Sequence, residues 1–295
     1  MSKLSSSLKA LINAPDSAKR SSKQCFFTVM AGFVGSLTLP HSPRMNSPAN
    51  CPEMTLTYPV IYNQQTAATM TMNSPDSLAI LFQLVASAQT EEESVATAEL
   101  MREVGLKCIS FNGIPRTINC LNAFKASLPE AVSKKLSRTP TRVPDPGNIN
   151  EIGRRGRALW DSIYRPYETK LVNKLADSHP DLPVHILNSH YGALLSDPAK
   201  RTTGANAGRI VTSIVAISCL RAQSGVGPQV TSHVFGLRKA IEDGSWADDV
   251  ETEQGALWLA SDEGNTWILA SVDDIVQSIS EGAGSNFAPL RTSKL

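Results

Sequence analysis

The sequence predicts an all-helical protein, and three observations support that prediction. Residues 74–76 (SPD) place a cap residue, a proline and an acid where a helix begins. Thr90 and Glu93 have the spacing of a capping box, in which each side chain bonds the other's backbone. After these signals, apolar residues recur every three to four positions, which is the period of a helix face.

The helical segments follow one another along most of the chain. We expect them at 74–88, 90–105, 115–127, 152–164, 168–178, 184–195, 207–222, 228–242 and 271–280. Segment 207–222 is rich in valine and isoleucine, so a strand is its alternative, but its length favours a helix. A short hairpin is also expected, because 257–260 and 266–270 flank the turn-like sequence DEGN.

The first 73 residues differ in composition from the rest. Prolines interrupt any regular period, so we expect an unstructured arm over 1–73. Its beginning is rich in serine, lysine and arginine and poor in acids, which is typical of a mitochondrial presequence. A mis-called start is another explanation, since Met70 and Met72 lie just before the first clear helix signal. A structured segment is the remaining alternative.

The remaining chain is expected to form one helical domain over 74–281. The segment 136–150, with three prolines and a glycine, is a linker. It divides the domain into halves at about 74–137 and 151–244, which a C-terminal helix follows. Residues 282–295 are rich in small residues and are expected to form a flexible tail.

Composition argues against several classes of function. Among 295 residues, 28 basic and 27 acidic side chains nearly cancel, so nucleic acid is not an expected partner. The longest uncharged run, 25–39, is too short to span a bilayer. The five cysteines form no C-x-x-C pair, and His185 and His190 are spaced for different faces of an α-helix. We therefore expect a reducing compartment, no metal site and no cofactor.

The chain ends in Ser293, Lys294 and Leu295, the tripeptide that the peroxisomal import receptor recognises. The expected location is therefore the peroxisome, with the receptor as a partner. The mitochondrion is the alternative, because of the composition of the first residues. The tripeptide predicts where the protein works and leaves its chemistry open.

Two motifs resemble a known superfamily. The sequence FNGIPRTINCLNAF at 111–124 resembles the helix start G-x-P-x-x-x-N-A-L of the carboxymuconolactone decarboxylase and alkylhydroperoxidase D-like superfamily. The sequence QVTSHVFGL at 229–237 resembles its second signature helix, H-V-x-G-A-L. The chain is most similar to a fungal-type, two-half version whose members often carry a peroxisomal signal. The resemblance implies an all-helical bundle of two related halves that forms homo-oligomers.

The residues depart from the peroxidase branch of that superfamily. There a cysteine pair precedes the histidine by seven and four positions, which here are Val226 and Gln229. The proton-relay glutamate would fall within 209–214, which contains no acid. A thiol peroxidase is therefore disfavoured, and peroxide reduction through Cys219 stays as a second alternative.

The decarboxylase branch needs no cysteine pair and implies acid/base chemistry on a small organic acid or acyl compound. His233 is the expected catalytic residue, because an imidazole titrates near neutrality. The alternative is a structural histidine of the core. Gln229 lies one helical turn earlier and would orient the substrate or cap the helix.

Three further side chains would bind the substrate. Arg116 and Arg221 offer guanidinium forks for a carboxylate, and Asn119 offers a polar contact near Arg116. Structural ion pairs and helix-to-helix hydrogen bonds are the alternatives for these residues. A non-catalytic helical binding or scaffold protein of the peroxisome is the first alternative to an enzyme.

Overall fold

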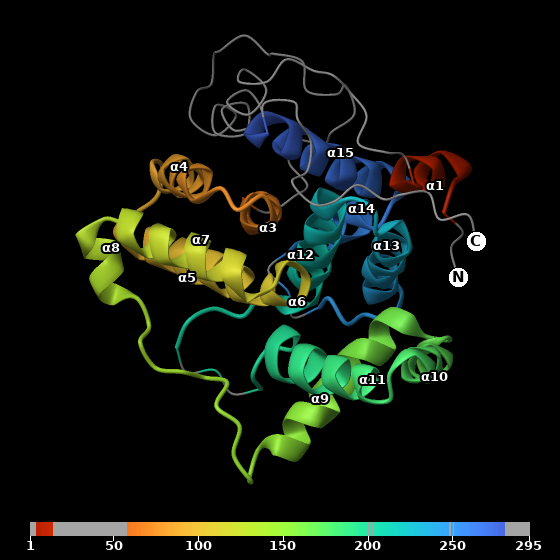
Figure 1. Ribbon diagram of the computed structural model, residues 1–295. Coiled ribbons are helices and arrows are strands. Elements are labelled where there is room, and N and C mark those ends of the chain that lie inside the picture. The colour runs from red at the N-terminus through yellow and green to blue at the C-terminus, as the bar shows by residue number, and fades with distance from the viewer. Residues whose placement is uncertain are drawn as a thin grey trace.

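The computed structural model describes residues 4–13, 58–199, 201, 203–247, 249 and 251–280, and within these ranges it contains helices and no strands (Figure 1). The helices are α1 (Ser6–Asn13), α3 (Tyr58–Thr71), α4 (Pro75–Ala86), α5 (Glu91–Lys107), α6 (Ile109–Asn112), α7 (Ile114–Ser127), α8 (Glu130–Lys135), α9 (Ile149–Tyr164), α10 (Glu168–Ser178), α11 (Asp181–His185), the π-helix η1 (Ile186–Leu195), α12 (Gly208–Gln223), α13 (Gly227–Glu242), α14 (Glu253–Leu259) and α15 (Asp262–Ile279). The all-helical prediction is confirmed for this part of the chain.

Helix α12 lies at the centre of the molecule. It packs against α3, α13 and α15, and every residue from Arg209 to Ala222 is buried. A helix enclosed on all sides has no polar face, which explains why its sequence lacks an amphipathic period and resembles a strand. The expected helix at 207–222 is confirmed.

Two layers flank α12. Figure 1 shows α4, α5, α7 and α8 on one side and α9, α10, α11 and η1 as a layer below, which contacts α13 through α9. Close contact within the lower layer requires glycine: a Cβ on Gly156 of α9 would lie 2.5 Å from the backbone nitrogen of Gly192 in η1. Helices α9 and η1 therefore pack closely together, and α9 in turn packs against α13.

The expected helix signals are present. Both hydrogen bonds of the capping box form, from the Thr90 amide to Glu93 Oε2 (2.8 Å) and from the Glu93 amide to Thr90 Oγ1 (3.3 Å). Pro75 lies at the start of α4. Residues 136–148 contain no helix, and α9 begins at Ile149, within the predicted linker at 136–150.

The expected hairpin is wrong, because α14 and α15 occupy its place. Thr252 Oγ1 accepts a hydrogen bond from the Gly255 amide (3.1 Å), and Ser261 Oγ accepts one from the Gly264 amide (3.0 Å). These N-caps make the sequence DEGN the first turn of a helix. The last helix accordingly begins at Asp262 and not at Ser271.

The expectation of an unstructured arm is wrong for α1 and α3. Helix α3 is buried against α12 although it is largely polar. Thr66 Oγ1 donates to Tyr62 O (2.8 Å) and Thr71 Oγ1 to Ala67 O (2.7 Å) within the helix, and Gln64 donates to Ile268 O (2.8 Å). Polar side chains satisfied in this way can be buried without an apolar pattern. Residues 1–3 and 14–57 lie outside the described residues.

Two further points concern the ends of the chain and the membrane. The tail at 282–295, with Ser293, Lys294 and Leu295, lies outside the described residues. No helix in the described part of the chain is long and apolar enough to cross a membrane.

Candidate functional site

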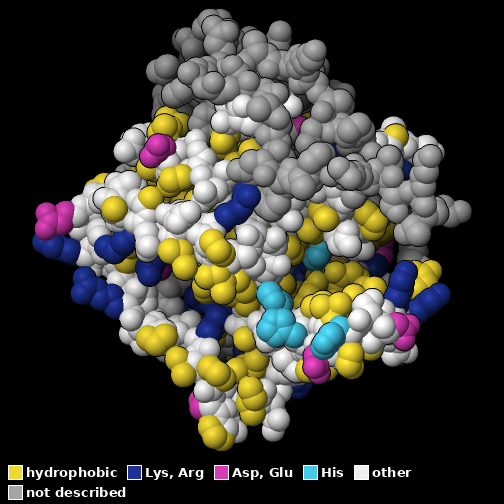
Figure 2. All heavy atoms as spheres, in the orientation of Figure 1, with side chains coloured by type: hydrophobic (Ala, Val, Ile, Leu, Met, Phe, Trp, Pro, Cys, Tyr) yellow, Lys and Arg dark blue, Asp and Glu magenta, His cyan; other side chains and the backbone are white. Residues whose placement is uncertain are grey.

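His233 lies one layer below the surface, where α13 meets α6 and α9. Its side chain is 4% exposed, and no hydrogen-bond partner is found for its Nδ1 atom within the described structure. Its ring centroid is 6.0 Å from that of Phe111 and 6.1 Å from that of Tyr164, both edge to face. Figure 2 shows, on one face of the molecule, a hollow lined by hydrophobic side chains with histidine side chains at its edge.

Aromatic side chains of the lower layer form one wall of this site. Tyr164 contacts Trp160, with 4.1 Å between ring centroids, and its hydroxyl is hydrogen-bonded to that of Tyr191 (3.1 Å). Burial raises the pKa of Tyr164 and raises that of Tyr191 well above its usual value. Both phenols therefore stay protonated at neutral pH.

Arg209, in the first turn of α12, supplies the positive charge of the site. Its Nε donates to Ser162 Oγ (3.1 Å), its Nη2 to the Gly236 carbonyl (2.8 Å) and its Nη1 to Ser213 Oγ. All three acceptors are neutral. Among the described residues, no carboxylate forms an ion pair with this buried guanidinium. We call Arg209, His233, Tyr164, Tyr191 and Phe111 the His233 pocket.

The His233 imidazole is neutral. Burial, followed by the positive charge of Arg209, lowers its pKa from 6.5 to about 3. The expectation that this residue titrates near neutrality is therefore wrong, because the sequence did not reveal its burial or the nearby cation. A neutral imidazole offers one nitrogen as donor and the other as acceptor.

The other predicted site residues do not join this pocket. Gln229 is exposed, although it lies one turn before His233 on α13. Arg116 donates to the Thr71 carbonyl, and Asn119 donates to Asn73 Oδ1 (3.3 Å). Arg116 and Asn119 thus meet at the turn between α3 and α4 and share no contact with His233.

Arg221 has a structural role that differs from the predicted substrate contact. Its Nε and Nη2 bond the two carboxylate oxygens of Asp273 at 2.7 and 2.6 Å, and its Nη1 donates to the Leu11 and Ile12 carbonyls at 3.1 and 3.3 Å. The guanidinium fork is therefore already occupied. It fastens α1 and α15 to the end of α12.

The cysteines in the described part of the chain are buried free thiols. The Sγ atoms of Cys219 and Cys108 are 3.5 Å apart, and both residues are fully buried. Burial, with a smaller contribution from Cys219, raises the pKa of Cys108 well above its usual value. A nucleophilic thiol needs access and a low pKa, so this environment argues against peroxide reduction.

The two histidines of the lower layer lie closer than expected. His185 and His190 are five residues apart at the start of the π-helix, and their ring centroids are 5.2 Å apart. A π-helix brings residues i and i+5 together, so the assignment to different faces is wrong. No group of three or more histidine, cysteine or acidic residues that could hold a metal occurs among the described residues.

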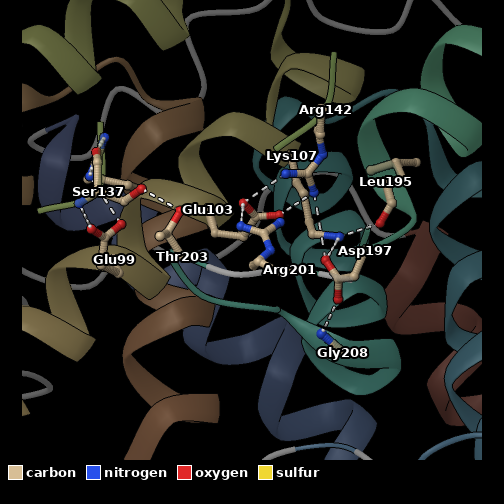
Figure 3. A network of polar contacts seen from close by, with 11 residues as sticks. Glu99, Glu103, Lys107, Ser137, Arg142, Leu195, Asp197, Arg201, Thr203 and Gly208 are labelled. Carbon is tan, nitrogen blue, oxygen red and sulfur yellow. Dashed lines mark hydrogen bonds and ion pairs between the residues drawn. The ribbon is translucent and has the colours of Figure 1, made fainter. Parts of the chain in front are cut away.

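A second buried polar cluster contains charges of both signs (Figure 3). We call it the charged clasp; its members are Glu103, Lys107, Arg142, Asp197 and Arg201. Lys107 Nζ lies 3.0 Å from Asp197 Oδ1, and Glu103 accepts hydrogen bonds from Arg142 (3.1 Å) and Arg201 (3.1 Å). The clasp fastens the linker after α8 and the loop after η1 to α5.

Sequence reasoning identified His233 but missed the groups that surround it. Arg209 had one signal: with Arg221, it is a charged residue in an otherwise uncharged run at 207–222. Tyr164 and Tyr191 are 27 positions apart, on α9 and η1, and no linear pattern joins them. Only packing of the lower layer against α13 places these groups together.

Comparison with known proteins yields one similar curated protein. The chain is 31% identical over 179 residues to "Peroxisomal protein 2" of Saccharomyces cerevisiae, covering 54% of this chain and 60% of the relative. This relative supports peroxisomal localisation. No family model matches the chain, and no solved structure matches it. The chain therefore spans about 60% of the length of the curated relative it matches.

Proposed function

We propose that this chain is a peroxisomal protein with an alkylhydroperoxidase D-like helical domain of two related halves, at about 74–137 and 151–244. The motif at 229–237, the helical architecture and the peroxisomal relative support the proposal. Ser293, Lys294 and Leu295 would bind the import receptor. The domain would form a homo-oligomer, as the resemblance implies.

The proposed activity is acid/base chemistry on a small organic acid or acyl compound in the His233 pocket. The observation that supports it is a buried imidazole with an unpartnered Nδ1 near a guanidinium that forms no ion pair with a carboxylate among the described residues. A neutral imidazole nitrogen can accept a proton from a carbon acid and return it to the same or another carbon. Arg209 would stabilise the enolate formed in between.

The other predicted residues have smaller parts in this proposal. Gln229 is exposed and would contact a substrate only at the mouth of the pocket. Arg116 and Asn119 would bind a substrate only at the α3–α4 turn, away from His233. Of the residues predicted from the sequence, only His233 therefore keeps a catalytic role in this proposal.

The test starts from a strain that lacks the gene. The wild-type gene or a variant is reintroduced, and the metabolites of each strain are profiled. The wild type and His190→Gln should restore the metabolite that accumulates, because His190 lies on η1 outside the pocket. His233→Gln should restore none of it while retaining the thermal unfolding transition of the folded protein. Full restoration by His233→Gln would overturn the proposal and favour a binding or scaffold protein.

A further inference from the structure

We propose that His185 and His190 form a surface site for one divalent transition-metal ion of the kind that prefers imidazole ligands. The site lies at the start of η1, outside the His233 pocket, and it does not depend on the proposed acid/base activity. In an α-helix the two side chains would lie on different faces, so their spacing in the sequence argued against a shared site.

The π-helix brings the two imidazoles together. His185 is the last residue of α11, and His190 lies within η1. A π-helix closes its hydrogen bonds between residues i and i+5, so these two positions lie on the same face. π-Helical turns are rare, and they occur frequently at functional sites. The unusual local structure therefore creates the histidine pair.

The separation of the two rings fits two ligands of one ion. A bond from a tetrahedral zinc ion to an imidazole nitrogen is about 2.0–2.1 Å long, which places the centroids of two such rings about 5 Å apart. The ring centroids of His185 and His190 are 5.2 Å apart, with 82° between the ring planes. The rings are therefore already at the separation that a shared ion requires.

The hydrogen bonds of the two rings leave the same nitrogen of each available. His185 Nδ1 is hydrogen-bonded to Ser189 Oγ (3.0 Å), and His190 Nδ1 to Ser110 Oγ of α6 (3.1 Å). Neither Nε2 atom has a hydrogen-bond partner within the described part of the chain. When Nδ1–H donates to the serine oxygen, Nε2 carries the lone pair that an ion needs.

The two serines also resemble the usual support of a metal site. A metal-bound histidine almost always donates a hydrogen bond from its second ring nitrogen, which fixes the tautomer and the orientation of the ring. Ser189 and Ser110 are placed to accept these bonds. Ser110 belongs to α6, so the orientation of His190 depends on the packing of η1 against that helix.

The histidine pair is accessible from solvent. His185 is exposed, and His190 is partly buried. Histidine side chains are visible at the molecular surface in Figure 2, at the edge of the hollow lined by hydrophobic side chains. An ion could therefore reach both rings without an enclosed cavity, and water would complete its coordination.

The ligand set indicates which ions would bind. Imidazole nitrogens suit zinc, copper and nickel, whereas magnesium and calcium prefer oxygen ligands. No group of three or more histidine, cysteine or acidic residues that could hold a metal occurs among the described residues, so the protein would supply two ligands. An ion held by both rings would link the end of α11 to η1 and would stabilise the folded chain.

The test uses the full-length protein without a histidine tag, titrated with ZnCl₂ in a calorimeter. We expect saturable binding of Zn²⁺. At an ion concentration about 100 times the dissociation constant, the midpoint of thermal unfolding should rise by roughly 3–6 °C. MgCl₂ should give neither effect. No saturable binding of Zn²⁺ up to about 1 mM would overturn the inference.

Variants assign the binding to the histidine pair. His185→Gln and His190→Gln should each lower the affinity for Zn²⁺ by about 100-fold or more, and Ser110→Ala should lower it by about 10-fold because it removes a supporting hydrogen bond. The matched control is His179→Gln, because His179 is exposed and its Nδ1 accepts a hydrogen bond from the Asp181 amide (3.1 Å). Unchanged affinity in both pair variants would overturn the inference even if Zn²⁺ binds elsewhere on the chain.

Copper provides a readout that a purely structural role of the histidines would not change. Electron paramagnetic resonance of the protein loaded with Cu²⁺ should show hyperfine splitting from two imidazole nitrogens, and from one in His185→Gln. Identical spectra for these two proteins would contradict a shared ion. The metabolite test of His233 has a separate outcome, because His190→Gln should lose the ion and still restore the metabolite.

Discussion

The charged clasp and the His233 pocket both bury cations, and they differ in what surrounds those cations. In the clasp, Lys107 pairs with Asp197, and Arg142 and Arg201 share Glu103. In the pocket, the hydrogen-bond acceptors of the Arg209 guanidinium are neutral, and Asp243 and Asp249, which act on its charge, form no ion pair with it among the described residues. The clasp therefore pairs its cations directly with carboxylates, while the charge of Arg209 is offset only by the more distant acids Asp243 and Asp249.

Burial by itself does not show whether a charged side chain stabilises the fold or serves a functional site. The partner of the buried charge distinguishes these two roles. A buried charge whose partner comes from another segment of the chain fastens the two segments together. A buried charge without such a partner lowers stability, which is a common property of binding and catalytic sites. Substitution should therefore lower the free energy of unfolding more in the clasp than in the pocket.

The largest effect is expected from Glu103→Gln in the clasp. The substitution leaves Arg142 and Arg201 buried without their shared counter-charge. Breaking a buried pair from one side costs about 3–5 kcal/mol in the free energy of unfolding, which urea denaturation measures. The surface variant Glu151→Gln, which loses a pair with Arg154, should cost under about 0.5 kcal/mol. A cost below that of the control would show that the clasp does not stabilise the fold.

A smaller effect is expected from Arg209→Met in the pocket. The variant removes three hydrogen bonds but also relieves the desolvation of a buried cation, which Asp243 and Asp249 offset without an ion pair among the described residues. Because these contributions oppose each other, the free energy of unfolding should fall by less than about 2 kcal/mol. Urea denaturation of Arg209→Met and Glu103→Gln under the same conditions compares the two losses of unfolding free energy directly. A loss as large as that of Glu103→Gln would remove the distinction between the two regions.

The smallest effect is the pH dependence of stability. The pKa of His233 is about 3 in the folded protein and 6.5 in the unfolded chain, so the unfolded chain binds more protons between these values. Its contribution is present above pH 6.5 and is lost as pH falls toward 3, by about 1.5 kcal/mol between about pH 6.5 and about pH 5.

Asp249 acts in the opposite direction, which fixes the design of this measurement. Burial raises the pKa of its carboxyl to about 6, so its contribution is present below pH 3.8 and is lost as pH rises to 6. The difference in unfolding free energy between wild type and His233→Gln, measured at several pH values, cancels this effect. A difference that does not vary with pH would contradict the burial of a neutral His233.

Much of the fold could be predicted because helix signals are local. Neighbouring residues predict the cap at Thr90, the start of α4 at its proline, and the approximate bounds of α7, α9 and α10. Helix α3 could not be predicted, since several of its buried polar side chains bond to partners that only the fold provides. The π-helix was also missed, and with it the proximity of His185 and His190.

The site was predicted only in part, for the same reason. The motif around 229–237 identified His233, but its charge state depends on burial and on Arg209. Arg221 and Arg209 look alike in the sequence, and within the described residues the fold gives Arg221 an ion pair with a carboxylate and Arg209 hydrogen bonds to neutral acceptors. A prediction from residue type alone therefore chose the arginine that is already occupied.

The sequence by itself determined the helices with local start signals, the candidate histidine and the peroxisomal location that the relative supports. The tertiary structure decided which charges are paired, because Glu103 and Arg201, or Arg209 and Gly236, come from segments far apart in the chain. Pairing and burial are properties of position in space. They determine whether a charged side chain stabilises the fold or remains available to a ligand.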